Sequence, residues 1–297
     1  YRAYLRIADG CNNRCTYCAI PLIRGNLVSE PMEELVQEAE RLAAGGVTEL
    51  TLIAQDTSGY GIDRYGKPML LDLLSRLEDI ESLHWIRVLY TYPDTVTPEL
   101  IDRFRAGGKV LPYLDMPLQH TEDGMLRRMH RRGDQAHIKS VLDYIAKNTP
   151  EFMLRTTLMV GFPGETDTDF ANMLCFMQKH PFDRVGAFSF SPEEGTAAAN
   201  LSDQVPEEVK QERLAKLMET QQAISRARNE RRIGQTVEVL IEGFDGSRAF
   251  GRSYAEAPDV DGKIYLEGTG ALPIGSYVFA RLTRAEEYDM IGELAKK

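Results

Sequence analysis

Three of the four cysteines lie within eight residues of one another. Cys11, Cys15 and Cys18 have the spacing C-x3-C-x2-C, whereas Cys175 stands alone. An apolar run just before them predicts a short strand, so the three thiols follow its carboxyl end. Three thiolates on one loop can bind three irons of a 4Fe–4S cluster and leave the fourth iron open. The alternatives are chance clustering and a zinc site, which would need a fourth ligand although the nearest histidine, His84, is far along the chain.

The composition limits the class of protein. The chain has 297 residues, 43% of them hydrophobic and 27% charged, and its net charge is −10. This apolar fraction supports a packed core and excludes wholesale disorder. So few cysteines exclude a disulfide-stapled scaffold and favour a reducing, cytoplasmic setting, and Cys175 is expected to be a buried small hydrophobe. The negative charge gives no general help in binding nucleic acid, and no run of about 18 apolar residues predicts a membrane helix.

Residues 1–200 alternate between strand-like and helix-like runs. This alternation predicts an α/β fold with a parallel sheet and right-handed crossovers, and its six strands are fewer than the eight of a full barrel. The pattern alone leaves an open doubly wound sheet and an incomplete barrel as alternatives, and in both the ligands bind at the carboxyl ends of the strands. The predicted strands are 4–8, 50–54, 85–89, 113–116, 154–160 and 185–190, and the predicted helices are 31–44, 69–79, 97–105, 122–130, 135–147 and 168–179.

The pattern changes in the last third of the chain. One long polar helix is predicted over 206–232. After it, strands at 236–241, 263–266 and 277–280 lie between turns rich in Gly and Asp, which is typical of a small antiparallel β-barrel. The sequence therefore predicts two domains, residues 1–232 and residues 233–297.

The cysteine motif resembles that of the radical S-adenosylmethionine (SAM) superfamily. It follows a first strand and has an aromatic residue, Tyr17, directly before its last cysteine. The resemblance implies a partial (βα)6 barrel, a 4Fe–4S cluster held by the three cysteines, and SAM bound to the open iron. It further implies that SAM is cleaved to a 5′-deoxyadenosyl radical, which abstracts a hydrogen atom from the substrate.

Four residues are candidate contacts for SAM. Tyr17 would pack beside the adenine, and Gln55, at the end of the second predicted strand, would contact the amino-acid part. Arg155 would either meet the carboxylate or form a structural ion pair. Gly161 would either let the backbone approach SAM closely or only make a tight turn after the fifth strand. No residue is assigned a catalytic role beyond these cofactor contacts.

Narrower motifs resemble those of methylthiotransferases, which insert a methylthio group at an unactivated C–H bond. The C-terminal barrel resembles a TRAM domain, the substrate-binding module of these enzymes. The motifs follow one another along nearly the whole chain, at residues 9–21 with 24–25, 54–61, 117–120 with 126–129, and 161–166.

Two branches of that family differ in substrate. MiaB-like enzymes modify a tRNA adenosine, and RimO-like enzymes modify the β-carbon of an aspartate in the twelfth protein of the small ribosomal subunit. Residues 188–196 resemble the RimO-like version, which carries two acids before Gly-Thr. Residues 230–297 contain nine Lys and Arg against twelve Asp and Glu, which opposes tRNA binding and suits a basic ribosomal protein. The acids expected to be available to that partner are Glu238, Glu242, Glu256, Asp259 and Asp261.

Full-length members of the resembled family carry an N-terminal domain with three more cysteines for a second 4Fe–4S cluster. This chain begins almost on its first strand, so we expect a shortened chain that binds the first cluster and SAM but does not complete methylthiolation. The resemblance also implies an electron donor such as a flavodoxin. The alternatives are a tRNA-modifying enzyme and a non-catalytic iron–sulfur module, which would have a fourth protein ligand and no SAM.

Overall fold

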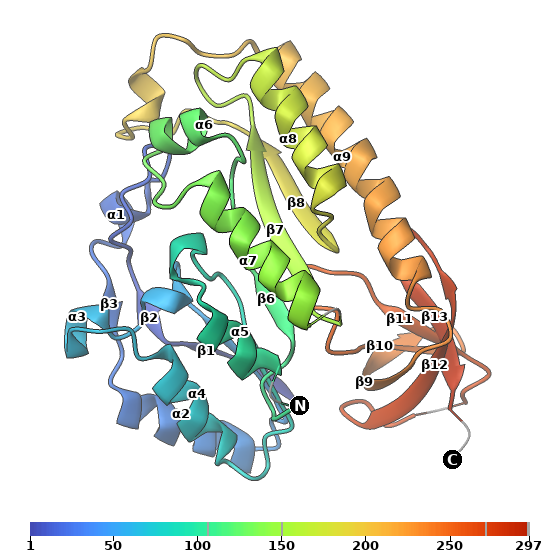
Figure 1. The fold of residues 1–297 in the computed structure, drawn as a ribbon. Coiled ribbons are helices and arrows are strands. Elements are labelled where there is room, and N and C mark those ends of the chain that lie inside the picture. Colours follow the sequence, from blue (N-terminus) through green and yellow to red (C-terminus); the bar gives the residue numbers. More distant parts are fainter. Residues whose placement is uncertain (106, 150, 271, 296–297) are drawn as a thin grey trace. The chain divides into compact units, whose positions relative to one another are not determined.

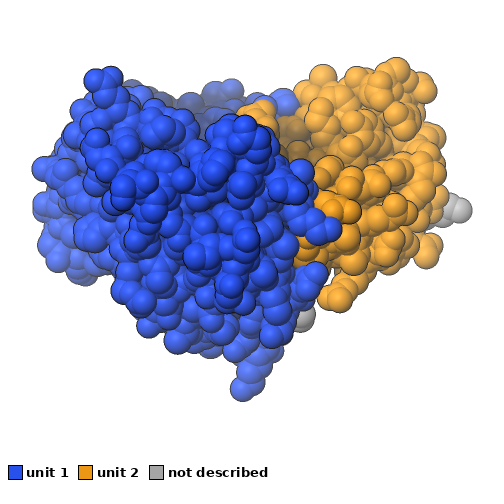
Figure 2. Space-filling model, turned by 90° about the horizontal axis from the view of Figure 1, so that it is seen from above, with its two compact units in different colours: residues 1–181, 185–218 blue, residues 182–184, 219–297 orange. Residues whose placement is uncertain are grey.

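The computed structural model describes residues 1–105, 107–149, 151–270 and 272–295. The chain divides into two compact units, which Figure 2 shows in different colours. Unit 1 comprises Tyr1–Pro181 and Val185–Met218, and unit 2 comprises Phe182–Arg184 and Glu219–Lys297. Among the described residues, none of the helices combines the length and the apolar character needed to cross a bilayer.

The sheet of unit 1 follows the order of the sequence (Figure 1). Strands β1, β4 and β5 form one set and β6, β7 and β8 a second, and a bridge between Ile86 and Val110 links β5 to the segment that enters β6. A doubly wound sheet would reverse its strand order, whereas this one does not, so the incomplete barrel is confirmed. The strands are β1 (Arg2–Arg6), β4 (Glu49–Ile53), β5 (Trp85–Val88), β6 (Tyr113–Asp115), β7 (Met153–Val160) and β8 (Arg184–Ser189).

Helices follow the strands and bury one apolar face each. Leu35, Val36 and Ala39 form such a face on α2, in the i, i+1, i+4 pattern of an amphipathic helix. The strands β5 and β6 are buried along their whole length, as expected for a parallel sheet that is covered on both faces. The helices are α2 (Met32–Ala44), α4 (Leu70–Glu78), α5 (Pro98–Arg105), α6 (Asp123–Arg128), α7 (Gln135–Asn148) and α8 (Asp167–Lys179).

The expected burial of Cys175 is wrong. On α8, Met173, Phe176 and Met177 are buried, and Cys175 lies on the opposite, exposed side. Apolar neighbours in the sequence do not decide burial on a helix, because residues two apart face different directions.

Four short α-helices and β-strands in the described part of unit 1 were not predicted, and neither were the strands at 248–252 and 290–294 in unit 2. β2 (Ala8–Asp9) pairs antiparallel with β3 (Val28–Ser29), and α1 (Ile20–Ile23) lies between them. α3 (Ile62–Tyr65) follows the second strand of the barrel. The paired β2 and β3 bring the two ends of the cysteine loop together.

Unit 2 contains a closed five-stranded barrel among its described residues. Its interior is apolar and includes Val237, Val239 and Ile241. The barrel expected from the sequence is confirmed, but β11 and β13 pair in parallel, whereas the other neighbouring strands are antiparallel. The strands are β9 (Thr236–Asp245), β10 (Arg248–Arg252), β11 (Ile264–Glu267), β12 (Tyr277–Ala285) and β13 (Met290–Leu294).

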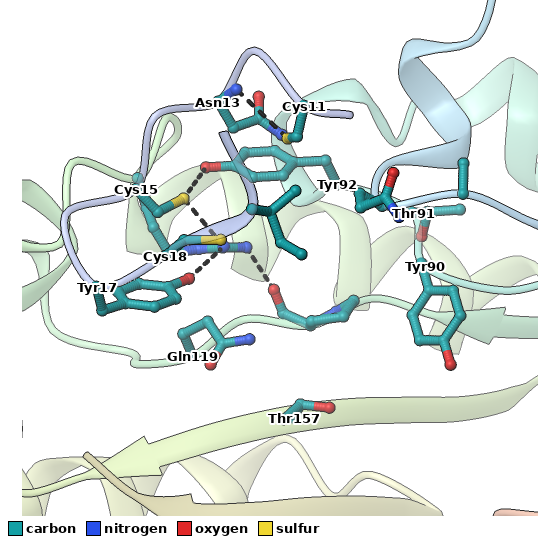
Figure 3. A pocket seen from close by; sticks show the side chains of 15 residues that line it. Cys11, Asn13, Cys15, Tyr17, Cys18, Tyr90, Thr91, Tyr92, Gln119 and Thr157 are labelled. Carbon is teal, nitrogen blue, oxygen red and sulfur yellow. Dashed lines mark hydrogen bonds between the residues drawn. The ribbon is translucent and has the colours of Figure 1, made fainter. Parts of the chain in front are cut away.

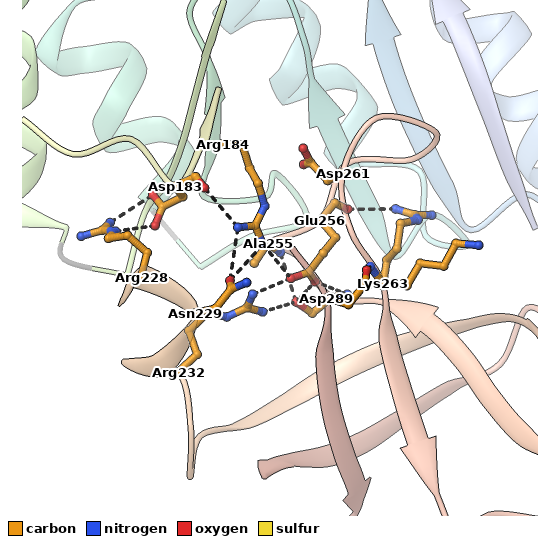
Figure 4. Close-up of polar contacts among 12 residues, drawn as sticks. Asp183, Arg184, Arg228, Asn229, Arg232, Ala255, Glu256, Asp261, Lys263 and Asp289 are labelled. Atoms are coloured by element: carbon orange, nitrogen blue, oxygen red, sulfur yellow. Dashed lines mark hydrogen bonds and ion pairs between the residues drawn. The ribbon is translucent and has the colours of Figure 1, made fainter. Parts of the chain in front are cut away.

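The predicted long helix is α9 (Glu207–Glu230), which contributes its first part to unit 1 and its last part to unit 2. Beyond its end, Arg232 donates to the carboxylate of Glu256, and Arg184 lies 3.7 Å from the same carboxylate (Figure 4). Glu256 is fully buried and also accepts from Ser253. The expectation that Glu256 is available to a partner is therefore wrong, because its charge is satisfied inside unit 2.

Candidate functional site

A cavity of about 420 Å³ in unit 1 is lined by all three clustered cysteines (Figure 3). The other walls come from the segments at the carboxyl ends of successive strands. Gln55 follows β4, Tyr92 follows β5, Gln119 follows β6, and Thr157 lies on β7. The cysteine loop therefore lies where the carboxyl-end rule for parallel strands places a ligand.

Gly10 makes the entry to the cysteine loop possible. Its φ is +72°, and a Cβ there would lie 2.1 Å from the carbonyl oxygen of Asn26. The next residue, Cys11, donates its N–H to the carbonyl oxygen of Gly25 at 3.3 Å. This close approach of two backbone segments requires glycine.

The side chain of Asn13 holds the loop from one side. Its Nδ2 donates to Oδ2 of Asp56 at 2.8 Å, and Asn13 and Asp56 are both buried. The other carboxylate oxygen of Asp56 accepts from Ser58 Oγ at 2.6 Å and from the N–H of Gly59 at 3.1 Å. One buried carboxylate thus connects the cysteine loop to the turn after β4.

A second segment, residues 128–132, holds the loop from the other side. Thr16 donates its N–H to the carbonyl oxygen of Met129 and its hydroxyl to that of Arg128, both at 3.0 Å. Nδ1 of His130 lies 2.9 Å from the carbonyl oxygen of Arg14. This basic segment therefore packs on the cysteine loop, and within it Arg131 lines the cavity.

The thiols lie in a partly buried environment. Burial raises the pKa values of Cys11 and Cys18 above their ordinary value of 9.0. The Sγ atom of Cys15 lies 3.9 Å from the hydroxyl of Tyr92. Burial also raises the pKa of Tyr92 to about 12, so this hydroxyl keeps its proton.

Within the described ranges, no three His, Cys, Asp or Glu side chains are arranged to hold a single metal ion. The cysteines of a 4Fe–4S cluster bind separate irons, so their sulfurs need not converge on one point. Three sulfurs spaced around one cavity have the donor chemistry that such a cluster requires.

Two of the four residues predicted to contact SAM line the cavity. Tyr17 points its hydroxyl toward Arg131, which donates to it at 3.1 Å, and its ring contacts Phe162 edge to face with centroids 6.4 Å apart. Gln55 is exposed to the cavity. These two side chains and the three cysteines line one cavity, and the contact of Tyr17 and Gln55 with SAM stays a prediction.

The other two predicted contacts do not line the cavity. Arg155 on β7 donates to Asp115 at 2.8 Å, which is the ion pair that the sequence analysis held as the alternative. Gly161 has φ +70°, and a Cβ there would lie 2.3 Å from Cγ of Lys210. The space that this glycine leaves is filled by the stem of Lys210.

Gln119 also lines the cavity, although no pattern in the sequence indicated a role for its side chain. Its φ is +68°, an uncommon value for a residue other than glycine. Its Oε1 is buried and has no hydrogen-bond partner among the described residues. An acceptor left unpaired in a cavity wall is a candidate ligand contact. The motif at residues 117–120 indicated that this segment belongs to the site. It did not indicate which of its side chains would line the cavity.

Comparison with known proteins identifies the family. A model of the radical SAM superfamily matches residues 5–177, and a TRAM domain model matches residues 233–295. The ribosomal protein uS12 methylthiotransferase RimO of Moorella thermoacetica is 50% identical over 293 residues, covering 98% of this chain and 67% of the relative. The chain belongs to the RimO family. A second RimO, from Trichlorobacter lovleyi, is 46% identical over 298 residues and covers 99% of this chain.

The RimO relatives are longer than this chain, which spans about two thirds of their length. Among solved structures, the radical SAM enzyme coproporphyrinogen III oxidase (HemN) of Escherichia coli matches with TM-score 0.55 and 17% identity, covering 94% of this chain and 66% of that one. The radical SAM methyltransferase TsrM of Kitasatospora setae matches with TM-score 0.51 and 15% identity, covering 63% and 36%. At these identities the structures support the fold of a radical SAM enzyme and nothing finer. Membership of the superfamily implies a 4Fe–4S cluster and SAM.

Proposed function

We propose that this chain is the SAM-cleaving and substrate-binding part of a radical SAM methylthiotransferase that acts on the β-carbon of an aspartate in ribosomal protein uS12. The observation that carries the proposal is the cavity in which Cys11, Cys15 and Cys18 meet the carboxyl ends of the barrel strands. The similarity to RimO enzymes over both domains supports the choice of substrate. A tRNA substrate is not favoured, because the relatives named above are RimO proteins. A ribosomal protein substrate supports a cytoplasmic location, which we propose as well.

In this proposal the three cysteines hold the 4Fe–4S cluster and SAM fills the rest of the cavity. When bound, the cluster would supply one electron for the cleavage of SAM to methionine and a 5′-deoxyadenosyl radical. The unpaired Oε1 of Gln119 fits a ligand that carries hydrogen-bond donors, as SAM does with its amino and hydroxyl groups. Tyr17 and Gln55 enclose and orient SAM, whereas direct contacts of Arg155 and Gly161 with SAM stay predictions.

Further parts of the proposal concern groups beyond this cavity. The relatives' greater length supports the proposal that a second 4Fe–4S cluster is held by residues outside the printed sequence, and a flavodoxin-type protein is the proposed electron donor. The domain match at 233–295 supports the proposed boundary after residue 232. The acidic TRAM domain is proposed to bind the basic uS12 protein.

The test separates the cofactor chemistry from the substrate. The chain is reconstituted with iron and sulfide without oxygen, reduced with dithionite and given SAM, and 5′-deoxyadenosine is measured. We expect one cluster per chain and 5′-deoxyadenosine formation, neither of which occurs after Cys15→Ala. Binding to purified uS12 and to tRNA is then compared at two salt concentrations. Binding of tRNA in preference to uS12 would contradict the substrate assignment.

A further inference from the structure

Arg131 places a positive charge beside one of the clustered cysteines. Its Nη1 lies 3.9 Å from Sγ of Cys15 and donates to the hydroxyl of Tyr17 at 3.1 Å. Its Nη2 donates to the carbonyl oxygen of Pro117, and the guanidinium lies over the ring of Tyr92, 4.4 Å from the centroid. These contacts hold the guanidinium in one orientation at the wall of the cavity.

The backbone around Arg131 is tied to the cysteine loop. The N–H of Arg131 donates to the carbonyl oxygen of Leu126 at 2.9 Å, and that of Arg132 donates to the hydroxyl of Tyr92 at 3.2 Å. Thr16, next to Cys15, donates to the carbonyl oxygen two residues before Arg131. The distance between the guanidinium and the sulfur is therefore set by the fold and not by a mobile side chain.

The other charged side chains near this wall form ion pairs or hydrogen bonds with other groups. Arg132 pairs with Asp94 at 3.1 Å, and about half of its side chain is exposed. Asp56 accepts from Asn13, Ser58 and a backbone N–H. The contacts of Arg131 described above are with hydroxyl, carbonyl, sulfur and ring atoms, and none of these is a carboxylate.

We propose that Arg131 raises the reduction potential of the 4Fe–4S cluster held by Cys11, Cys15 and Cys18. The inference rests on the proposed function and adds a residue that controls how readily the electron enters. Reduction from the 2+ to the 1+ state adds one electron from a one-electron reductant, such as a reduced flavodoxin, and transfers no proton. The added negative charge is stabilised by a nearby cation and by an N–H donor at a ligating sulfur.

The test is a potentiometric titration of the reconstituted full chain, followed by the electron paramagnetic resonance signal of the reduced cluster, without SAM. Arg131→Gln keeps hydrogen-bonding capacity but removes the charge, so we expect a more negative midpoint potential. Arg131→Lys restores the charge and is expected to restore most of the potential. Arg132→Gln is the matched control, because it removes the neighbouring exposed charge and leaves Arg131 in place.

The results that would contradict the role of Arg131 differ from the results that would contradict the proposed function. A wild-type chain without iron, sulfide or the resonance signal contradicts the cluster itself, whereas a normal cluster with an unchanged potential in Arg131→Gln overturns only the role of Arg131. Equal shifts in Arg131→Gln and Arg132→Gln would also overturn it. If Arg131→Gln loses the cluster, Arg131→Lys is measured in its place. A midpoint potential close to that of wild type supports the inference. A midpoint potential as negative as removal of the charge should give contradicts it.

Discussion

The side chains next to the thiols determine whether the three sulfurs can bind one cluster. Cys11, Cys15 and Cys18 lie on a loop that makes hydrogen bonds to the turn after β4 and to residues 128–132. The thiols are the proposed ligands, and buried polar groups such as Asp56 keep the loop in its conformation. Both roles belong to single residues and can be tested by single substitutions.

The cysteine assignment predicts an unequal effect of four substitutions. Replacing Cys11, Cys15 or Cys18 by Ala removes one of three protein ligands, so iron bound per chain after reconstitution should fall to background. Cys175→Ala changes an exposed residue on α8, so iron content and unfolding temperature should stay the same. Iron and sulfide analysis of the four variants checks this, and comparable iron loss in Cys175→Ala would contradict the assignment.

The support of the loop by Asp56 predicts a loss of stability as well as of iron. Asp56→Ala leaves Asn13 Nδ2 and the N–H of Gly59 without their acceptor, and an unpaired buried donor costs about 1–3 kcal/mol. Chemical unfolding should show a decrease of that order, and iron should be lost faster to a chelator. Asp72→Asn, an exposed change on α4, is the control. Unchanged iron retention in Asp56→Ala would show that the loop does not depend on this carboxylate.

At the residue scale, the sequence pointed to the proposed cluster ligands but not to all of their neighbours in the structure. The spacing of the cysteines was sufficient to find them, because all three belong to one loop. Gln119 and Arg131 come from other loops, and their approach to the cavity depends on barrel closure, which no local pattern contains. Arg155 was placed on the correct strand, but its pairing with Asp115 depends on the register between β6 and β7.

At the element scale, long apolar runs were predictable and short pairings were not. The strands β4 to β7 are apolar and mostly buried, so their positions follow from composition. The two-residue strands β2 and β3 have no such pattern, since they form only because the chain returns past Gly10. The parallel pairing of β11 with β13 is likewise set by closure of the barrel and not by either strand's sequence.

Two glycines on elements near the site should respond to alanine in opposite directions. Gly10→Ala requires a left-handed backbone and places Cβ against Asn26, so the chain should lose about 1–3 kcal/mol or more of stability, with weaker iron retention. Gly124 lies on α6 with open space around its Cβ position, and Gly124→Ala should stabilise the chain by up to about 1 kcal/mol. Thermal unfolding of both variants measures the difference, and a tolerated Gly10→Ala would contradict the close approach described here.

At the scale of the whole molecule, net charge is a poor guide to the charge that a partner meets. Residues 230–297 are acidic by count, yet Glu256 is buried against Arg232 and Arg184, and Glu242 binds Arg252 at 2.8 Å. These carboxylates form ion pairs with arginines of unit 2 itself. The proposed attraction of uS12 therefore depends on the more exposed acids, such as Asp259.

The buried carboxylate of Glu256 predicts how the stability of unit 2 depends on pH. Although burial opposes the charged form, the charges of Arg232 and Arg184 and a hydrogen bond from Ser253 lower the pKa of Glu256 from 4.5 to about 2. A lowered folded-state pKa stabilises the fold above the unfolded pKa, and that stability is lost as the pH falls from about 4.5 through about 2. The contribution at neutral pH is on the order of 3 kcal/mol.

Calorimetry of the full chain between pH 7 and pH 3 tests this dependence. Glu256→Gln removes the carboxylate, so it should unfold at a lower temperature than wild type at pH 7, and the gap should narrow below about pH 4.5. Glu267→Gln is the matched control, because this glutamate is exposed on β11 and its ion pair with Arg284 is 4.0 Å long. The control should track wild type at every pH. If the difference in unfolding temperature between wild type and Glu256→Gln stays constant from pH 7 to pH 3, the charge of this carboxylate does not stabilise unit 2.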